Sequence, residues 1–227
     1  MSGIPLPCPL CGGSAASFGV KTGSSIIGYR RCEGCGFIGM EPSDRLSPAE
    51  EKARYLLHRN DAANRGYSDF LRAFIDKALA PFKKPGARIL DFGSGPIPVL
   101  AEMTAGMGYR CDRYDPFFAR TRSWEDRFYE AILLHEVAEH LREPGKVLST
   151  LAGRVARGGI LAIRTRFQPE AAEDFQNWWY RMDRTHVGFF TPSCLVKFFE
   201  SRGFTILLLE KPDILVVESA RHEDVLW

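Results

Sequence analysis

The amino-acid sequence predicts a doubly wound α/β fold preceded by a small cysteine-rich module. Three observations support this prediction. From residue 88 onward, short apolar runs alternate with amphipathic stretches, which is typical of strands that alternate with helices around a mostly parallel sheet. The first of these runs, RILDF, leads directly into the glycine-rich segment GSGP. Four of the six cysteines form two C-x-x-C pairs close to the start of the chain.

Composition limits the classes of protein to which the chain can belong. At 227 residues, with 45% hydrophobic and 12% aromatic side chains, it is long enough for one full core and a small additional unit. Thirty basic and 28 acidic residues are interspersed and give a formal charge of +2, which offers little support for nucleic-acid binding. No apolar stretch approaches the roughly 20 residues of a membrane span, and the first residues lack the pattern of a secretion signal. We therefore expect a soluble, cytoplasmic protein with no membrane partner.

The two C-x-x-C pairs indicate a metal site. Cys8 and Cys11 form the first pair and Cys32 and Cys35 the second, and a glycine follows each pair. Zinc prefers four tetrahedral thiolates, and a C-x-x-C turn lets two sulfurs reach the same ion. Disulfides or a redox-active pair are the alternatives, although disulfides are uncommon without secretion. The pattern predicts one zinc ion that is structural, because four thiolates leave no coordination position open.

The chain divides into three segments by composition. Residues 1–40 form the predicted zinc ribbon, in which short strands link the cysteine pairs and the metal replaces an apolar core. Residues 41–87 are a linker with two helices, the first starting at Ser47 with Glu50 three residues later, a capping-box pattern. Apolar residues at helical spacing predict the second helix: Phe70, Leu71, Phe74, Ile75 and Ala78. Residues 88–227 form the main domain.

The elements of the main domain follow from its apolar runs. Strands are predicted at 88–92, 109–114, 129–134, 159–165, 204–210 and 213–219. Helices are predicted at 97–107, 144–156 and 192–202. Only two residues separate the last two strands, so these are expected to form an antiparallel hairpin.

The turn after the first strand of the main domain has the features of a ligand-binding loop. Asp91 ends the strand, and Gly93, Ser94 and Gly95 follow before the next helix. Such a G-x-G turn lets backbone approach a ligand at the carboxyl edge of the sheet. Pro98 occupies the position of the third glycine of a dinucleotide-binding motif, so NAD is not indicated. A tight turn without a ligand is the alternative interpretation.

Further motifs follow in an ordered series. After LDFGSGP come YDP at the end of the second strand, AILLHEVAEHL at the fourth-strand position and ARGGILAI leading into the fifth. In this series the chain resembles the class I S-adenosylmethionine-dependent methyltransferases over residues 88 to about 219. The segment DRTHVGFFTPSCLVKFFESRGF is similar to the end of a subgroup that includes ubiquinone-pathway O-methyltransferases. An N-terminal ribbon is familiar from bacterial methyltransferases of unassigned substrate.

The resemblance implies a Rossmann-like methyltransferase sheet and S-adenosylmethionine as cofactor. By the family pattern, Asp91 and the turn from Gly93 to Gly95 surround the methionine part, Asp115 binds the ribose hydroxyls, and His135 contacts the cofactor. The methyl acceptor stays open between a small molecule, RNA and protein. The alternative from another class is a non-catalytic zinc-ribbon binding module on a degenerate methyltransferase scaffold.

The chain departs from the family after the second strand. Only 13 residues separate Asp115 from Tyr129, too few for the usual helix and third strand. We therefore expect a sheet that lacks one strand or has an abbreviated connection, and no adenine contacts are carried over from the family.

The segment HEVAEH, residues 135–140, concentrates chemically active side chains. It is not the zinc-protease motif, because position 139 is Glu139. A helix after the strand would place Glu136, Glu139 and His140 on one face. The spacing Glu-x-x-Glu-His resembles the metal-binding motif of ubiquinone-pathway O-methyltransferases and of small-RNA 3′-terminal 2′-O-methyltransferases. The latter add a later histidine, for which His186 is the candidate here.

This resemblance implies a magnesium or manganese ion, methylation on oxygen, and catalytic roles for Glu136, His140 and His186. The alternative is that Glu139 and His140 cap and pack a helix, while His135 or Glu136 only contacts the cofactor.

Overall fold

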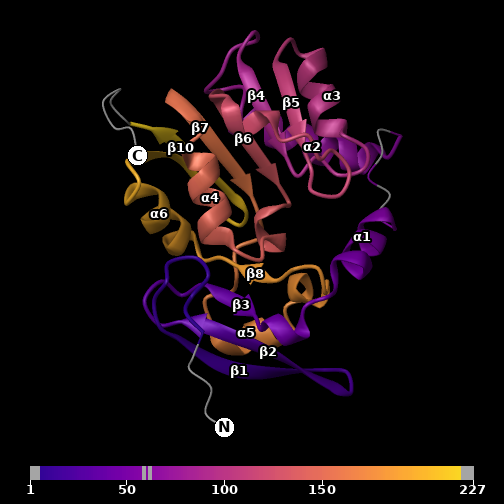
Figure 1. Cartoon of the computed structure of the whole chain (residues 1–227), viewed down its shortest axis with the longest axis vertical. Helices are drawn as coiled ribbons and strands as arrows, with labels where there is room; N and C mark the ends of the chain where they lie inside the picture. Colours follow the sequence, from indigo (N-terminus) through magenta and orange to yellow (C-terminus); the bar gives the residue numbers. More distant parts are fainter. Residues whose placement is uncertain (1–5, 58–59, 61–62, 221–227) are drawn as a thin grey trace.

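The computed structural model of the chain describes residues 6–57, 60 and 63–220 (Figure 1). Residues 1–5 of the predicted ribbon and 221–227 of the predicted main domain lie outside these described residues. Two sheets organise the described part: a six-stranded sheet and a four-stranded sheet at the opposite end of the molecule (Figure 1).

The six-stranded sheet has the order β5-β4-β6-β7-β10-β9. Its strands are β4 (Arg88–Phe92), β5 (Arg110–Tyr114), β6 (Tyr129–His135), β7 (Val155–Arg164), β9 (Phe204–Glu210) and β10 (Ile214–Ser219). The first four are parallel to one another, and β10 is antiparallel to both β7 and β9. The predicted strands and the antiparallel hairpin at the end of the sheet are therefore confirmed.

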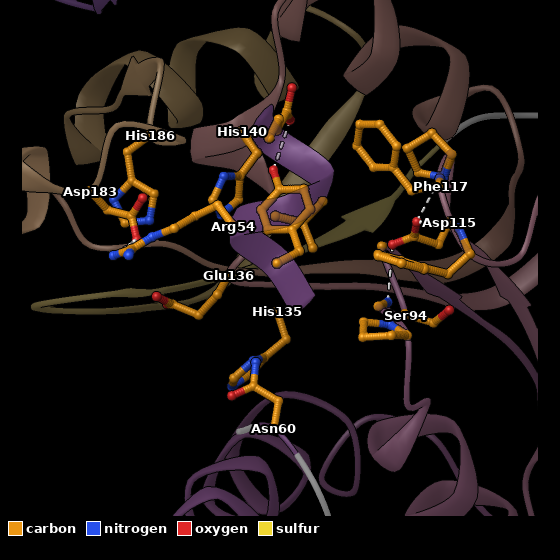
Figure 2. A pocket seen from close by; sticks show the side chains of 18 of the residues that line it. Arg54, Asn60, Ser94, Asp115, Phe117, His135, Glu136, His140, Asp183 and His186 are labelled. Carbon is orange, nitrogen blue, oxygen red and sulfur yellow. Dashed lines mark hydrogen bonds and ion pairs between the residues drawn. The ribbon is translucent and has the colours of Figure 1, made fainter. Parts of the chain in front are cut away.

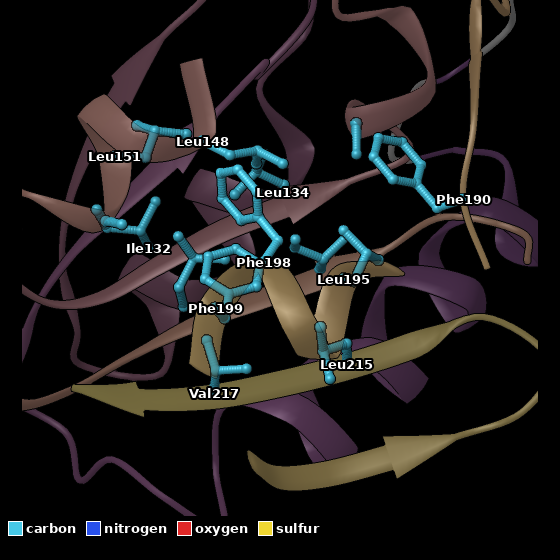
Figure 3. Close-up of a cluster of buried hydrophobic side chains, with 14 of the residues drawn as sticks. Ile132, Leu134, Leu148, Leu151, Phe190, Leu195, Phe198, Phe199, Leu215 and Val217 are labelled. Atoms are coloured by element: carbon cyan, nitrogen blue, oxygen red, sulfur yellow. The ribbon is translucent and has the colours of Figure 1, made fainter. Parts of the chain in front are cut away.

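Helices cover both faces of this sheet. On β6, Ile132 and Leu134 face one side and Ala131 and Leu133 the other, as expected for a strand buried on both faces. One face packs against α4 (Pro144–Ala152) and α6 (Pro192–Glu200), whose side chains form the cluster in Figure 3. The other face packs against α2 (Arg65–Ala78) and α3 (Val99–Gly106).

No strand lies between β5 and β6 along the described part of the chain. The connection to β6 contains instead a bridge between Asp115 and Ala119 and the 3-10 helix η2 (Ser123–Asp126). Trp124 of η2 is buried against the rings of Phe92 and Tyr114, with centroids 5.4 Å away in each case. The abbreviated connection expected from its length is thus observed, and one tryptophan fills part of the space beside β5.

The four-stranded sheet combines the ribbon with a distant segment. Its order is β1-β2-β3-β8, where β1 (Ala15–Thr22), β2 (Ser25–Cys32) and β3 (Ile38–Met40) belong to the ribbon. The last strand, β8 (Gly188–Phe189), comes from the main domain and lies beside β3 (Figure 1). Apolar side chains from both segments share one core: Val20, Ile27, Tyr29, Ile38, Met40, Phe175, Tyr180, Val187 and Phe189. The expectation that metal alone replaces an apolar core in the ribbon is therefore wrong.

The connecting segment forms the two expected helices. A 3-10 turn, η1 (Pro42–Asp44), precedes α1 (Pro48–Leu56), and both bonds of the capping box between Ser47 and Glu50 are present. In α2 the residues at helical spacing are buried against the sheet, apart from Phe70, which is 36% exposed. No helix within the described residues is long and apolar enough to cross a membrane.

Candidate functional site

A cavity of about 780 Å³ opens where the parallel strands β4, β5 and β6 end, beneath α1 (Figure 2). The structure brings most of the predicted site residues to its lining: Gly93, Ser94, Gly95, Asp115, His135, Glu136, His140 and His186. Asp91 and Glu139 are buried, with 3% and 0% of their surface exposed. The cavity thus joins the glycine turn at one end to the HEVAEH segment at the other.

The two glycines of the turn have different roles. Gly93 and Gly95 have φ angles of 85° and 68°, in the region that favours glycine. A Cβ atom on Gly93 would lie 2.5 Å from a methyl group of Val137, whereas a Cβ on Gly95 would have no atom within 4 Å. Gly93 therefore packs the turn against the loop after β6, and Gly95 leaves backbone accessible to a ligand.

Asp115 connects the glycine turn to the loop after β5. Its Oδ2 accepts a hydrogen bond from the backbone of Gly95 at 3.0 Å, and its Oδ1 accepts from Phe117 and Phe118 at 2.8 and 3.0 Å. Each carboxylate oxygen has two lone-pair sites. Oδ2 therefore retains capacity for a ligand hydroxyl, which is compatible with the predicted ribose contact.

Three buried polar atoms at the ends of β4 and β6 have no hydrogen-bond partner among the described residues: Oδ2 of Asp91, Oγ of Ser94 and Nε2 of His135. Buried polar atoms in proteins are nearly always bonded, so such atoms are candidates for ligand contacts. Burial raises the pKa of Asp91 to about 7. Burial lowers the pKa of His135 to about 3, and its ring lies edge-on against Phe70 and Phe74. His135 is therefore neutral and fixed in orientation.

The HEVAEH segment does not form the expected α-helical turn. Glu136 has a φ angle of 54°, which is uncommon for a residue with a side chain, and a short 3-10 helix, η3 (Ala138–His140), follows. Glu136 therefore does not share a helix face with Glu139 and His140. The capping alternative is not observed either, because α4 begins after Glu143 without a side-chain cap bond.

Tyr180, which no sequence motif marked, joins the two glutamates. It lies in the 3-10 helix η4 (Trp179–Met182), and its hydroxyl is 2.5 Å from Oε1 of Glu139 and 3.1 Å from Oε2 of Glu136. A phenol has one proton, so it can donate to one carboxylate and accept from the other. Burial and the neighbouring Glu139 raise the pKa of Glu136 to about 8. At neutral pH Glu136 therefore carries a proton and donates it to the hydroxyl of Tyr180, which donates its own proton to Glu139.

Two histidines face each other beside this network. Nδ1 of His140 lies 2.9 Å from the carbonyl oxygen of Thr185, and Nδ1 of His186 lies 2.6 Å from that of Tyr180. A carbonyl oxygen only accepts, so the proton of each neutral ring is on Nδ1 and the lone pair is on Nε2. Backbone hydrogen bonds of this kind orient metal-binding histidines.

Glu139, His140 and His186 form a possible metal-binding group. Their ligand atoms lie within 4.8 Å of one another, and Oε2 of the buried Glu139 has no hydrogen-bond partner among the described residues. Glu136 lies outside this group and reaches it only through Tyr180. Two imidazoles and one carboxylate suit manganese better than magnesium, which prefers oxygen ligands.

Helix α1 covers the cavity through aromatic and charged contacts that the sequence did not predict. The ring of Tyr55 meets the ring of His140 edge-on with centroids 5.3 Å apart, and lies 5.8 Å from Phe117 on the opposite side of the cavity. Arg54 and Asp183 form an ion pair of 3.5 Å between α1 and the loop after η4. These contacts link the loop at Asp115 to the histidine pair (Figure 2).

The four N-terminal cysteines converge as predicted. The sulfurs of Cys8 and Cys35 are 3.8 Å apart and those of Cys11 and Cys32 are 3.5 Å apart, and all four lie within 4.8 Å of one another. These separations exclude disulfides and approach the ~3.8 Å between thiolates that surround one tetrahedral zinc ion. The donor set fits zinc, and its occupancy stays a prediction.

Comparison with known proteins identifies the family. A family model described as a methyltransferase domain matches residues 62–209, which is more than half of the chain. The chain belongs to the methyltransferase domain family. Among proteins with curated descriptions, none matches this sequence significantly.

Solved structures show the same fold. The magnesium protoporphyrin IX methyltransferase from Synechocystis PCC 6803 with bound S-adenosylhomocysteine is 15% identical, with a TM-score of 0.54, covering 76% of this chain and 95% of that one. An O-methyltransferase family protein from Burkholderia thailandensis is also 15% identical, with a TM-score of 0.54, covering 77% of this chain and 64% of its own. The chain therefore has the class I S-adenosylmethionine-dependent methyltransferase fold.

Proposed function

We propose that the protein transfers a methyl group from S-adenosylmethionine to a hydroxyl oxygen of its acceptor. The observation that supports this most strongly is the set of buried, unpartnered polar atoms of Asp91, Ser94 and His135 beside the glycine turn. A carboxyl, a hydroxyl and a neutral imidazole together match the ammonium and carboxylate of an amino-acid moiety. Backbone at Gly95 and the remaining acceptor capacity of Asp115 suit the ribose.

The charge of the cavity also suits this cofactor. Three carboxylates line it, those of Glu51, Asp115 and Asp183, together with the carboxyl group of Glu136, against the single guanidinium of Arg54. Aromatic rings add negative π faces, which attract a sulfonium as they attract other cations. Within the described lining, the balance favours a cationic cofactor over a polyphosphate.

The chemistry requires little of the protein beyond orientation and proton removal. The sulfur–methyl bond breaks as the oxygen–methyl bond forms, and the acceptor hydroxyl loses its proton. Glu136 lines the cavity and is the proton acceptor in this proposal once it is deprotonated. In that deprotonated form Glu136 accepts the 3.1 Å hydrogen bond from the hydroxyl of Tyr180, whereas the protonated form that predominates at neutral pH donates it. Tyr55 of α1 covers part of the cavity through its contacts with His140 and Phe117.

A divalent ion fits the group of Glu139, His140 and His186. When bound, such an ion supplies positive charge that holds the acceptor hydroxyl and lowers its pKa. The two backbone carbonyls of Thr185 and Tyr180 keep both rings in the tautomer that this requires. We propose manganese as the natural ion and a structural zinc at the four cysteines.

Transfer of labelled methyl groups tests the proposal. Incubating the protein and labelled S-adenosylmethionine with a cell extract, followed by separation of small molecules, RNA and protein, is expected to label one fraction with an alkali-stable methyl ether. Replacing His140 or His186 by alanine should lower the label about 100-fold, because ligand or metal-site changes commonly cost this much. The metal-assisted step would be refuted if both variants labelled the fraction as strongly as the natural sequence does. Undiminished labelling by the natural sequence after removal of manganese and magnesium would refute it as well.

A further inference from the structure

The cavity has two halves that depend on different parts of the fold. The cofactor half lies at the carboxyl ends of β4, β5 and β6 of the large sheet and comprises Gly93, Ser94, Gly95, Asp115 and His135. The acceptor half comprises Tyr180, Asp183 and His186, which belong to the segment between β7 and β8. Within the described residues, no strand of the ribbon pairs with β4, β5 or β6, which share only side-chain packing with Cys8, Leu10 and Phe37. In contrast, β8 pairs through its backbone with β3 of the ribbon.

Backbone hydrogen bonds connect the ribbon directly to the acceptor half. The N–H of Met40, the last residue of β3, donates to the carbonyl of Val187 at 2.8 Å. The N–H of Val187 donates in turn to the carbonyl of Glu139, also at 2.8 Å. Val187 immediately follows His186, so two consecutive hydrogen bonds fix the separation between His186 and Glu139 from the ribbon side.

Side chains strengthen this connection. Arg181 is 2% exposed, and its guanidinium donates to Thr22 Oγ1 of β1 at 3.0 Å. Tyr180 and Val187 pack in the apolar core that the ribbon shares with this segment, next to Tyr29. The acceptor half therefore has its packing partners in the ribbon.

Gln168 links the second cysteine turn to β8. It is 5% exposed, and its Nε2 donates to the carbonyl of Gly36 at 2.7 Å and to that of Phe189 at 3.4 Å. Gly36 directly follows Cys35, so this one amide connects the metal-binding turn to the strand that follows His186. The first cysteine turn touches the main domain elsewhere, where the N–H of Gly145 in α4 donates to the carbonyl of Pro9. Helix α4 reaches the cavity through Val147, an apolar side chain that is not among the polar residues of either half.

We propose that the ribbon positions the acceptor half of the cavity, with Gln168 as a positioning residue. Loss of the thiolate metal or of the Gln168 amide then disorders Tyr180 and His186 while the cofactor half continues to bind S-adenosylmethionine. The assignment of the two halves rests on the proposed function. The dependence of residues 180–190 on the ribbon is independent of the proposed function, because it follows from the hydrogen bonds and packing alone.

Hydrogen exchange of the full chain tests this proposal. Two changes are compared with the natural sequence: Cys11→Ser, which removes an exposed thiolate without altering packing, and Gln168→Met, which keeps all four cysteines. Amides of residues 180–190 are expected to exchange about 10-fold faster in both variants. Gln168→Met removes the hydrogen bonds to Gly36 and Phe189, and Cys11→Ser removes one thiolate of the group to which the turn at Gly36 belongs. Amides of β4 and β6 should keep their rates, and the Kd for S-adenosylhomocysteine should change by less than about 3-fold.

Gln176→Met is the matched control, because this glutamine side chain is exposed, and it should leave every rate unchanged. In the zinc-loaded Gln168→Met variant, cobalt(II) absorption bands should also show about 10-fold weaker binding at Glu139, His140 and His186. Equal acceleration in both halves, or none in residues 180–190, would overturn the proposal. Failure of the natural sequence to bind S-adenosylhomocysteine would instead refute the proposed function, and the exchange pattern would still decide the role of the ribbon.

Discussion

Among single residues, Gly93 determines how closely the glycine turn packs against the loop after β6. Gly93→Ala would place a methyl group 2.5 Å from Val137 and require an L residue at a φ of 85°. We expect a loss of about 2–3 kcal/mol in the free energy of unfolding, combining overpacking with left-handed strain. Urea denaturation measures this loss.

Gly106→Ala is the control for this substitution. Gly106 ends α3, and an added Cβ would have no atom within 4 Å. We expect its stability to be unchanged or up to about 1 kcal/mol higher, since alanine restricts the unfolded chain. Equal destabilisation by the two substitutions would contradict the packing role of Gly93.

Asp91 predicts a pH dependence of stability. Burial raises the pKa of this carboxyl from 3.8 to about 7, so the folded state retains a proton that the unfolded state releases. The free energy of unfolding is therefore highest, with respect to this carboxyl group, below pH 4, where both states hold the proton. It falls as the pH rises from 4 to 7. A pKa shift of about 3 units corresponds to a loss of about 4 kcal/mol in the free energy of unfolding over this pH range. Asp91→Asn should therefore gain stability relative to the natural sequence between pH 4 and pH 8, as measured by denaturant unfolding, and a constant difference would contradict the raised pKa.

Residues of the site differed in how well the sequence predicted them. Local spacing that reflects a backbone or ligand requirement marked the glycine turn, Asp115 and the four cysteines. The structure brings the glycine turn and Asp115 to one cavity, and the four cysteines to a separate group. Tyr180, Tyr55 and Gln168 have no such spacing. Their roles arise from contacts between segments far apart in the chain, such as that between Glu139 and Tyr180, which are 41 positions apart. Single aromatic residues are also common in cores, so their type alone does not distinguish them.

Among elements, the connection after β5 replaces a strand with a buried tryptophan. Trp124→Ala should lower the free energy of unfolding by about 3–5 kcal/mol, because the side chain is 5% exposed and packs on Phe92 and Tyr114. Trp179→Ala is the control, since Trp179 is 64% exposed and should change stability by less than about 0.5 kcal/mol. Similar losses in both variants, measured by thermal unfolding, would contradict this account of the connection.

The pattern of elements was easier to predict than the details at their ends. Strands buried on both faces and helices with an apolar stripe are visible in the sequence, and the short spacing before Tyr129 already indicated the abbreviated connection. The two residues of β8 carry no periodic signal, because so short a strand is defined by its partner β3. The left-handed Glu136 was missed because local preference favours a helix there, whereas packing of Val137 on Gly93 accompanies the observed bend.

At the scale of the whole molecule, the ribbon and the main domain share their cores. Cys8, Leu10 and Phe37 pack in the same cluster as Leu134 and Leu195. We therefore expect the metal-loaded chain to unfold in a single cooperative transition, with coincident curves from far-ultraviolet circular dichroism and tryptophan fluorescence. Two separate transitions would show that the predicted boundary near residue 40 divides independent domains.

Calorimetric titration with S-adenosylhomocysteine shows whether the cavity beside the glycine turn binds this class of cofactor. We expect binding of one equivalent with a Kd on the order of 10 µM, and about 10-fold weaker binding after Asp115→Asn, because the carboxylate that holds the turn and accepts from the ribose is lost. NADH should give no heat. Absence of heat from the natural sequence at millimolar S-adenosylhomocysteine would contradict the account and leave a zinc-ribbon binding module on a methyltransferase scaffold.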